Sequence, residues 1–296
     1  MSDLDPIYRL PVDPSLRLKI VCYMDVTRSN PNGDPQGRGP RLDPFEHGFV
    51  SCACLKRMIR DYVEQHLEKE IYLKRGTDLS VAQQNYKTKD NQIDVDKMRA
   101  DLWDLPMFGA PLLQTKTPIR GALQVTDGVS VHPVILEEVP FTSSVGQVQE
   151  RKKKGSKEET EEYFQSAYNS YHLVNYGLYR FEATFNPADG AKHGVSRESL
   201  QALWAGLIEG WEYNRSAHRT GVNLRRVYVF QFPNTRGTEP SHVTAGRVRA
   251  ELIEGISEPR SFDDYIITVD DNLPSGVLLS RWEDGVVENE GRLAAK

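Results

Sequence analysis

Cysteine is scarce in this sequence, and only Cys22, Cys52 and Cys54 occur among 296 residues. Three cysteines cannot all pair within one chain, and an odd, low count is typical of proteins in a reducing cytoplasm. No apolar run approaches the roughly 20 residues that cross a bilayer, which excludes a transmembrane helix. The first residues are acidic and broken by proline, so we expect no signal peptide. The sequence therefore predicts a cytoplasmic protein with no membrane partner.

A net basic charge is also missing, because 37 Lys and Arg residues face 42 Asp and Glu residues and leave a net charge of −5. This balance argues against a protein that binds nucleic acid over its whole surface, but it is compatible with cations gathered on one face. The motifs of P-loop enzymes, dinucleotide-binding enzymes, serine hydrolases and zinc proteases are all absent. We therefore expect neither catalysis nor a cofactor. The 39% of hydrophobic residues suffices for a core and excludes global disorder.

Hydrophobic periodicity predicts the main elements of the fold. Apolar and polar residues alternate over 16–26, which is typical of a half-buried strand, and over 179–185, which also indicates a strand. Further strands are expected over 121–127 and 227–232. Two helices are predicted by apolar stripes at helical spacing, one capped by Ser51 and extending to Leu67, the other capped by Ser196 and extending to Trp211.

The segments between these elements predict loops and insertions. Residues 27–50 are rich in Pro, Gly, Asn and Asp and indicate a structured loop, and 186–195 indicates a turn. Residues 69–104 are polar and irregular, as expected of short helices and loops, and 137–170 indicates a protruding excursion. The resulting β-α-β-β-α-β order is the ferredoxin-like α+β pattern, an antiparallel sheet with two helices on one face. RNA-recognition motifs and many small enzymes share it, so the fold alone leaves the function open. We predict one elaborated domain over residues 1–296.

Cationic and amide side chains concentrate in the loop after the first strand. Arg28, Arg41, Asn30 and Asn32 accompany several glycines, whose turns can present backbone N–H groups to an anion. Phosphate-backbone binding and an ordinary ordered loop both explain this composition. A calcium loop is a third interpretation, but the spacing and closing glutamate of an EF-hand are missing.

Three further cationic groups occur along the chain. Lys56, Arg57 and Arg60 lie on one flank of the first predicted helix, where a solvated face or a groove shared with the preceding loop explains them. The segment 213–238 contains five arginines and no acidic residue; they are Arg215, Arg219, Arg225, Arg226 and Arg236. We expect Arg215 and Arg219 to end the second helix, where cations complement the helix dipole. Lys116 and Arg120 form the third group, with no acidic residue between them.

Several motifs together resemble one protein family. They are Asp25-Val-Thr27, Asn30-Pro-Asn-Gly-Asp-Pro35, Pro40-Arg-Leu-Asp-Pro44, Leu55-Lys-Arg-Met-Ile-Arg-Asp-Tyr62, Met107-Phe-Gly109, Ile119-Arg-Gly-Ala-Leu-Gln124, His172 with Tyr176-Gly-Leu-Tyr179, and Arg260-Ser-Phe-Asp-Asp-Tyr265. In this order they are similar to the backbone subunit of type I CRISPR interference complexes (Cascade), within the RAMP superfamily and its type I-C branch in particular. The resemblance spans most of the chain.

The resemblance implies a modified RNA-recognition-motif palm, a helical finger insertion near 69–104 and a thumb hairpin near 137–170. It implies a non-catalytic subunit whose copies assemble head to tail along the spacer of a CRISPR RNA. The guide then pairs with target DNA, and other Cascade subunits and a transient effector nuclease-helicase complete the set of partners. The residues predicted to bind RNA are Arg28, Asn30, Asn32, Arg41, Lys56, Arg57, Arg60, Lys116, Arg120, Gln124, His172, Arg215, Arg219, Arg225 and Arg226.

Two alternatives differ in class. One is a metal-dependent RNA-cleaving backbone subunit of type III kind, in which Asp34 would be the catalytic residue. The other is a stand-alone module that binds single-stranded nucleic acid without partners. Cleavage of complementary RNA would identify the first, and binding without ordered filaments would identify the second.

Overall fold

The computed structural model of the chain describes residues 9–35, 37, 39–112, 118–143, 148–152, 160–164 and 167–291. The described chain is a mixed α+β structure around a nine-stranded sheet with antiparallel pairing, which confirms the predicted α+β class. The strands follow the order β15-β14-β11-β1-β10-β6-β2, and β5 and β7 pair with β10 outside this path. Their bounds are β1 (Leu18–Ser29), β2 (His47–Val50), β5 (Leu123–Val125), β6 (Gly128–Pro133), β7 (Leu136–Ser143), β10 (Ala167–Phe185), β11 (Val222–Gln231), β14 (Leu278–Glu283) and β15 (Val286–Gly291).

β1 lies in the middle of the sheet, between β10 and β11. The alternation in its sequence correctly predicts a strand, but the prediction that only one face is buried is wrong. Ile20 and Met24 belong to the core on one face, whereas Val21 and Tyr23 belong to a second core on the other, and all four are 1% exposed or less. A central strand covered on both faces keeps its alternating pattern when the polar side chains on one face find buried partners.

Two helices, α1 (Cys52–His66) and α6 (Arg197–Tyr213), cover one face of the sheet. Both predicted N-caps are confirmed, because the side chain of Ser51 accepts from the Cys54 N–H and that of Ser196 from the Ser199 N–H. The predicted turn over 186–195 is wrong in part, because it contains the short helix α5 (Pro187–His193). Asn186 caps α5 and proline occupies its first turn, an arrangement that fits a helix start as well as a turn.

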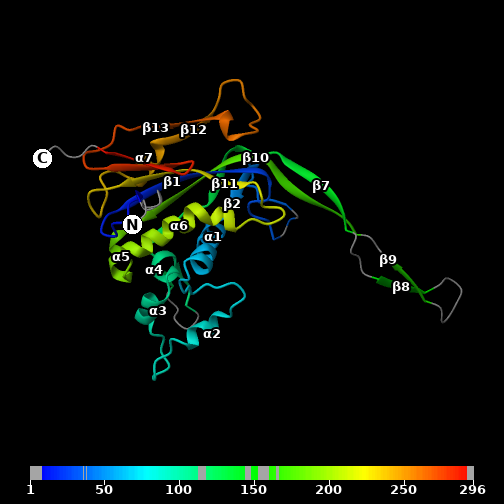
Figure 1. Cartoon of the computed structure of the whole chain (residues 1–296), viewed down its shortest axis with the longest axis horizontal. Helices are drawn as coiled ribbons and strands as arrows, with labels where there is room; N and C mark the ends of the chain where they lie inside the picture. Colours follow the sequence, from blue (N-terminus) through cyan, green and yellow to red (C-terminus); the bar gives the residue numbers. More distant parts are fainter. Residues whose placement is uncertain are drawn as a thin grey trace.

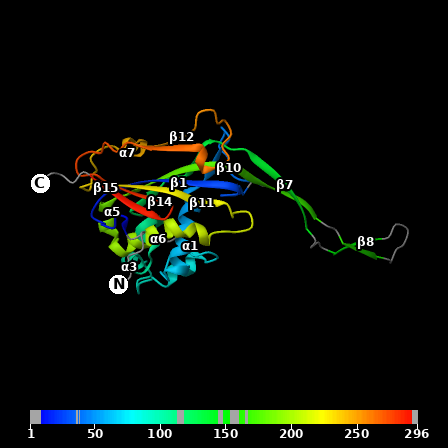
Figure 2. The ribbon, with the colours of Figure 1, turned by 45° about the horizontal axis from the view of Figure 1, so that its top comes forward.

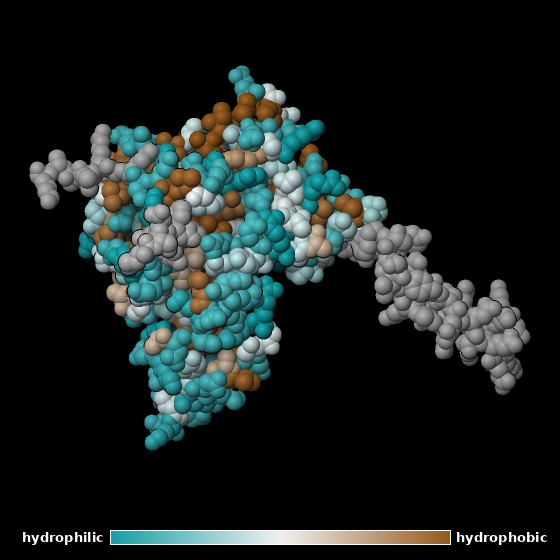
Figure 3. Space-filling model, viewed as in Figure 1, coloured by the Kyte–Doolittle hydropathy of each residue, from teal (hydrophilic) through white to brown (hydrophobic). Residues whose placement is uncertain are grey.

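The C-terminal segment covers the opposite face of the sheet. It contains α7 (Ser241–Gly246), β12 (Val248–Leu252), the 3-10 turn η2 (Phe262–Asp264) and β13 (Tyr265–Val269), and Figure 2 shows α7 and β12 above the sheet with α1 and α6 below it. The face shown in Figure 3 is mostly hydrophilic, although apolar side chains gather over this C-terminal layer at its top. The sheet therefore has helices on one side and a two-stranded layer on the other.

A small insertion with its own core follows α1. Its helices are α2 (Leu79–Gln84), α3 (Val95–Asp101) and α4 (Asp104–Phe108), followed by the short pair β3 (Gly109–Ala110) and β4 (Ile119–Arg120). Tyr72, Met98, Leu102 and Leu105 form the centre of this core, which is separate from the two cores of the sheet. The irregular polar pattern of 69–104 thus correctly predicts short helices and loops.

A long hairpin projects from the sheet, as Figure 1 shows. We call it the hairpin arm; it consists of β7, β8 (Val148–Lys152), β9 (Thr160–Phe164) and residues 167–174 of β10. Its base is the pairing of Leu136 with Val174, and β7 stays paired with β10 as far as Ser143 and Ala167. The protruding excursion predicted over 137–170 is confirmed for its described residues. No described helix is long and apolar enough to cross a membrane.

Candidate nucleic-acid interface

Three chain segments meet at the end of β1 that lies nearest the hairpin arm. Thr27 N–H donates to the Gly221 carbonyl at 2.8 Å, and Asn30 N–H donates to the His218 carbonyl at 2.7 Å. The rings of His218 and Tyr171, a residue of the arm, lie 4.0 Å apart between centroids. The loop after β1, the loop after α6 and the base of the arm therefore form one continuous surface.

The loop after β1 is held in shape by its own polar groups. Arg41 Nε donates to the Gly33 carbonyl at 3.1 Å, and Arg41 N–H donates to the Asn32 carbonyl at 3.1 Å. The Asn32 side chain accepts from the Ser51 N–H at 2.9 Å, which connects the loop to the first turn of α1. A Cβ atom at Gly39 would lie 2.9 Å from His172 Cβ, so only glycine permits this close approach of loop and arm.

Two predicted residues, Arg28 near the end of β1 and Asn30 at the start of the loop, have polar groups that are exposed or without a partner. Arg28 forms an ion pair with Glu137 of the arm at 3.1 Å, yet 60% of its side chain is exposed. The side-chain oxygen of Asn30 is buried and, among the described residues, has no hydrogen-bond partner. Both residues adjoin the junction of loop and arm.

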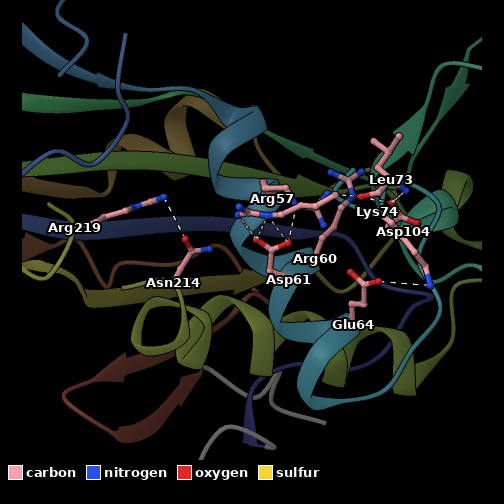
Figure 4. Close-up of polar contacts among 10 residues, drawn as sticks. Arg57, Arg60, Asp61, Glu64, Leu73, Lys74, Asp104, Asn214 and Arg219 are labelled. Carbon is pink, nitrogen blue, oxygen red and sulfur yellow. Dashed lines mark hydrogen bonds and ion pairs between the residues drawn. The ribbon is translucent and has the colours of Figure 1, made fainter. Parts of the chain in front are cut away.

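The cationic flank of α1 faces the insertion more than solvent (Figure 4). Arg60 is only 5% exposed, forms an ion pair with Asp104 at 2.7 Å and lies 4.9 Å from the centroid of the Phe108 ring. Arg57 forms an ion pair with Asp61 at 2.8 Å and donates to the Leu73 carbonyl. A solvated flank is therefore the wrong description of this helix face, because residues 70–75 and 104–108 pack on it.

Lys56 occupies the other side of the same flank. Its ammonium group lies 5.8 Å from the centroid of the Phe108 ring, and burial lowers its pKa. Lys56 remains partly exposed, so its charge is more accessible than that of Arg60.

A cavity of about 390 Å³ opens between α1, the loop around Arg75 and the end of α6. Three arginines, Arg75, Arg215 and Arg219, line it together with a single carboxylate, that of Asp61. We call this cavity with these four residues and Tyr213 the arginine pocket. Its lining carries an excess of positive charge, in contrast to the acidic chain as a whole.

The arginines of this pocket differ in how far they are neutralised. Arg75 pairs with Asp61 at 2.5 Å, and that hydrogen bond raises the pKa of Arg75, whose side chain is 65% exposed. Arg215 pairs with Glu212 at 2.6 Å. Arg219 donates to Asn214 Oδ1 at 3.3 Å and to Cys54 Sγ at 3.5 Å, both neutral groups, so its charge is the least compensated of the three.

An aromatic cluster borders the arginine pocket. Tyr213 is 60% exposed, and its ring lies 5.2 Å from that of Tyr62 and 3.8 Å from that of His66. Arginines beside an exposed aromatic ring are suited to a phosphate with a neighbouring base. Sequence reasoning missed both Arg75 and Tyr213, because Arg75 belongs to the irregular insertion and Tyr213 lies outside the apolar stripe of its helix.

The loop after α6 corrects one prediction. The helix ends at Tyr213, with Asn214 as its C-cap, so Arg215 and Arg219 lie beyond it rather than in its last turn. They reach the arginine pocket because the loop turns back toward α1.

Two predicted residues, Arg120 and Gln124, belong to the other end of the sheet. Gln124 on β5 pairs with Thr184, whereas His172 lies beyond Val174 on the same strand β10. Ten residues of strand separate Val174 from Thr184, or about 33 Å. Arg120, 70% exposed and 3.6 Å from Asp189, lies near Gln124, and Lys116 lies outside the described residues. Arg120 and Gln124 are therefore remote from the arginine pocket.

Arg225 and Arg226 lie on the face of the sheet that carries the C-terminal layer. Arg225 pairs at 2.7 Å with Asp25, a fully buried carboxylate, and Arg226 pairs at 2.8 Å with Asp284. Both guanidinium groups lie over the ring of Phe262, at 5.4 and 4.8 Å. These contacts give both residues internal partners. Among the described residues, no cluster of three metal-ligating side chains occurs.

Comparison with known proteins identifies one family. The family model for CRISPR-associated protein Cas7 matches residues 16–270. No curated protein sequence matches the chain significantly.

Solved structures give weaker likenesses. A chain of a CRISPR RNA-guided surveillance complex in a pre-nicking state has a TM-score of 0.45 and 14% identity, covering 72% of this chain and 78% of that one. A second surveillance-complex chain has a TM-score of 0.42 and 17% identity, with 72% and 68% covered. A chain of a type III-B Cmr-beta complex bound to cognate target RNA has a TM-score of 0.35 and 11% identity, with 72% and 61% covered.

Proposed function

The chain belongs to the Cas7 family of CRISPR-associated proteins, and on this premise we propose that it is a non-catalytic, CRISPR-RNA-binding backbone subunit of a type I, Cascade-like complex, of the I-C kind. One observation carries the proposal: the arginine pocket and the loop after β1 form a positively charged surface at one end of an otherwise acidic protein. Such a surface holds a phosphate backbone without reading its sequence, as a subunit that accepts any guide must do.

In this proposal the whole chain is one elaborated domain. The strands β1, β5, β6, β10 and β11 with α1 and α6 form a palm of the RNA-recognition-motif kind. The insertion with α2 and α3 corresponds to the fingers, and the hairpin arm corresponds to the thumb. The C-terminal layer covers the face on which such motifs usually stack bases, so contacts to phosphate and sugar remain the available mode.

The proposed RNA contacts form a path across the site. Arg28, Asn30 and His172 lie where the loop meets the arm, and Arg41 shapes the loop between them. Arg75, Arg215 and Arg219 with Tyr213 continue the path at the arginine pocket. Internal hydrogen bonds and ion pairs of Asn32, Arg57 and Arg60 hold the loop and α1 in place. Lys56 lies at the edge of the surface.

The partners follow from this role. Copies of the chain would line up head to tail on the guide, with each arm reaching toward its neighbour. The guide would pair with target DNA, and other Cascade subunits and a transient nuclease-helicase effector would bind the assembled filament. Base identity would be read by pairing alone, as in other RNA-guided systems.

Purification with a guide tests the proposal. The chain would be co-expressed with its neighbouring genes and a CRISPR array, captured by a tag, and its nucleic acid run on a denaturing gel. We expect one sharp RNA band and several copies of the chain per RNA. The double variant Arg75→Gln with Arg219→Gln should lose most of that RNA, because both arginines line the pocket.

A matched variant separates this effect from a general loss of charge. Arg236→Gln with Arg249→Gln removes two exposed arginines away from the pocket and should keep the RNA band. If wild-type chain carries no RNA or only a heterogeneous smear, the proposed function is wrong. If the pocket variant retains a full RNA load, the RNA path is misplaced.

A further inference from the structure

A second cavity, of about 590 Å³, lies between the insertion and the segment from α5 to α6. On the insertion side it is lined by Lys69, Arg99 and Trp103, and on the other side by Lys192, His193 and Ser199. We call it the insertion cavity. Figure 1 shows α3 and α4 close to α5 in this part of the molecule. α5 follows the end of β10 opposite the hairpin arm, so the cavity is remote from the loop after β1.

His193 leaves one ring nitrogen unused in this cavity. The residue is 6% exposed, and its Nδ1 has no hydrogen-bond partner among the described residues. The imidazole also makes a hydrogen bond to the backbone of Arg120, one that raises its pKa and in which the ring is therefore the donor. Burial, followed by the charges of Arg99 and Lys192, lowers the pKa of His193 overall. The ring is thus neutral, and Nδ1 presents a lone pair that requires a donor.

Arg99 leaves a donor unused in the same cavity. Its Nη1 pairs with Asp96 at 2.9 Å, but its Nε is buried and has no partner among the described residues. A buried guanidinium N–H without an acceptor costs free energy in the folded protein. An occupant that supplies an acceptor would remove this cost.

The acidic groups of the cavity already have partners. Asp96 pairs with Arg99, and its side chain is 92% exposed; Glu70 pairs with Lys74 at 2.7 Å. Asp101 bonds to the hydroxyl group of Tyr86. The N-terminus of α6 is satisfied as well, because Ser196 and Ser199 cap it reciprocally. Lys69 and Lys192 remain as cations whose charge can serve an anionic occupant.

These groups define what the occupant must offer. It needs a hydroxyl to donate to His193 Nδ1, an oxygen to accept from Arg99 Nε, and negative charge to match the two lysines. A ribose phosphate has all three, and the cavity has room for a whole nucleotide. We infer that the insertion cavity is a ribonucleotide-binding site, in which a ribose hydroxyl meets His193 and the phosphate meets Arg99, Lys69 and Lys192. The nucleotide is either free or part of an RNA strand.

Calorimetric titration of the purified full chain tests this site. Adenosine monophosphate should bind, and its 2′,3′-dideoxy analogue should bind about fivefold more weakly, because it lacks the donor for His193. Arg99→Gln should weaken adenosine monophosphate about tenfold or more, because a charge-assisted hydrogen bond is lost. Lys97→Gln is the matched control on the same helix; Lys97 does not line the cavity and should leave affinity unchanged.

Absence of binding by adenosine monophosphate at millimolar concentration would overturn the inference. Equal affinity for the two nucleotides, or for wild type and Arg99→Gln, would overturn it as well. His193→Gln is the second variant if Arg99→Gln fails to fold, and it should abolish the preference for ribose over dideoxyribose.

A six-nucleotide RNA distinguishes the two sources of the ligand. Competition between this RNA and adenosine monophosphate would identify a strand, and failure to compete would identify a free nucleotide. The result is independent of the proposed function, because loss of this site would leave the guide RNA recovered from the filament unchanged.

Discussion

At the scale of single residues, Asp104 organises the contact between α1 and the insertion. Its carboxylate is fully buried and accepts from Arg60 Nε at 2.7 Å, Tyr72 N–H at 2.6 Å and Leu73 N–H at 3.3 Å. Each donor would be left unsatisfied in the interior without it. A buried charge with a full set of partners fixes geometry more than it adds stability, and removing one partner is costly.

Replacing this carboxylate gives the first prediction. Asp104→Ala should lower the free energy of unfolding by about 3–5 kcal/mol, because it leaves the Arg60 guanidinium buried without a counter-charge. Urea denaturation followed by circular dichroism measures the change. Asp96→Ala is the control, because Asp96 is 92% exposed, and its effect should stay within about 0.5 kcal/mol. A loss below about 1 kcal/mol for Asp104→Ala would contradict this account.

The same pair shows what a sequence cannot reveal about single residues. Helical periodicity correctly places Arg57 and Arg60 on one flank of α1, beside the apolar stripe. It cannot show that Asp104, 44 residues later, returns to cover that flank. Nor does it show that Arg75 shares the carboxylate of Asp61 with Arg57. Local spacing predicts which side chains share a face, whereas long-range packing decides whether that face meets solvent.

At the scale of elements, two of the segments that carry the family resemblance, 107–109 and 119–124, pack against each other at the end of the insertion. Gly109 on β3 pairs with Arg120 on β4, and Gly121 follows at the crossing. A Cβ atom at Gly121 would lie 2.3 Å from both the Gly109 nitrogen and the Phe108 carbonyl carbon. Because these are backbone atoms, no side-chain movement could relieve the contact.

Gly121→Ala should therefore displace the backbone of this crossing. We expect it to lower the free energy of unfolding by about 1–3 kcal/mol, as overpacking does in tight interiors. Gly246→Ala is the matched control, because a Cβ atom there meets nothing within 4 Å and alanine favours the helix. Thermal unfolding of both variants measures the difference. Equal melting temperatures would show that the crossing tolerates a methyl group.

The hairpin arm provides a second prediction at this scale. Pro140 and Ser170 face each other across β7 and β10, so residues 141–169 can be replaced by an Asn-Gly turn. The removed part projects away from the cores, and the melting temperature should therefore change by only a few degrees. If the arm bridges neighbouring copies, the truncated chain should bind RNA as single copies. Mass photometry would then show complexes with the mass of one chain and one RNA. Long filaments formed by the truncated chain would contradict a bridging role for the arm.

The elements themselves were predictable to different degrees. Strong periodicity correctly predicts β1, α1 and α6, and Ser51 and Ser196 mark both helix starts. The composition of 186–195 predicts a turn, because Asn, Pro, Asp and Gly favour turns, although Asn before Pro also starts a helix such as α5. The burial of both faces of the sheet was not predictable from β1, because the layer that covers one of them lies more than 200 residues later.

At the scale of the whole molecule, the charges are separated rather than balanced. The chain carries a net charge of −5, yet the arginine pocket combines three arginines with one carboxylate. Arg247, in the C-terminal layer, is by contrast paired with two acids, Glu239 and Asp270, at 2.8 and 2.9 Å. An acidic exterior repels nucleic acid except where positive charge is left over, so the distribution itself directs a strand to one end of the protein.

This separation predicts how salt acts on RNA binding. Each phosphate neutralised by a cation releases counterions, and for single strands the slope of log K against log salt is about −0.7 per contact. Arg75→Gln and Arg219→Gln should each make the slope of the wild-type chain shallower by about 0.7, with any RNA sequence of equal length. Arg247→Gln should leave the slope unchanged, because two carboxylates neutralise its charge and its side chain is only 13% exposed, whereas that of Arg75 is 65% exposed. Fluorescence anisotropy between about 50 and 200 mM salt measures all four slopes. Identical slopes for wild type and both pocket variants would mean that RNA bypasses the arginine pocket, whereas a shallower slope for Arg247→Gln would place the strand on the opposite layer.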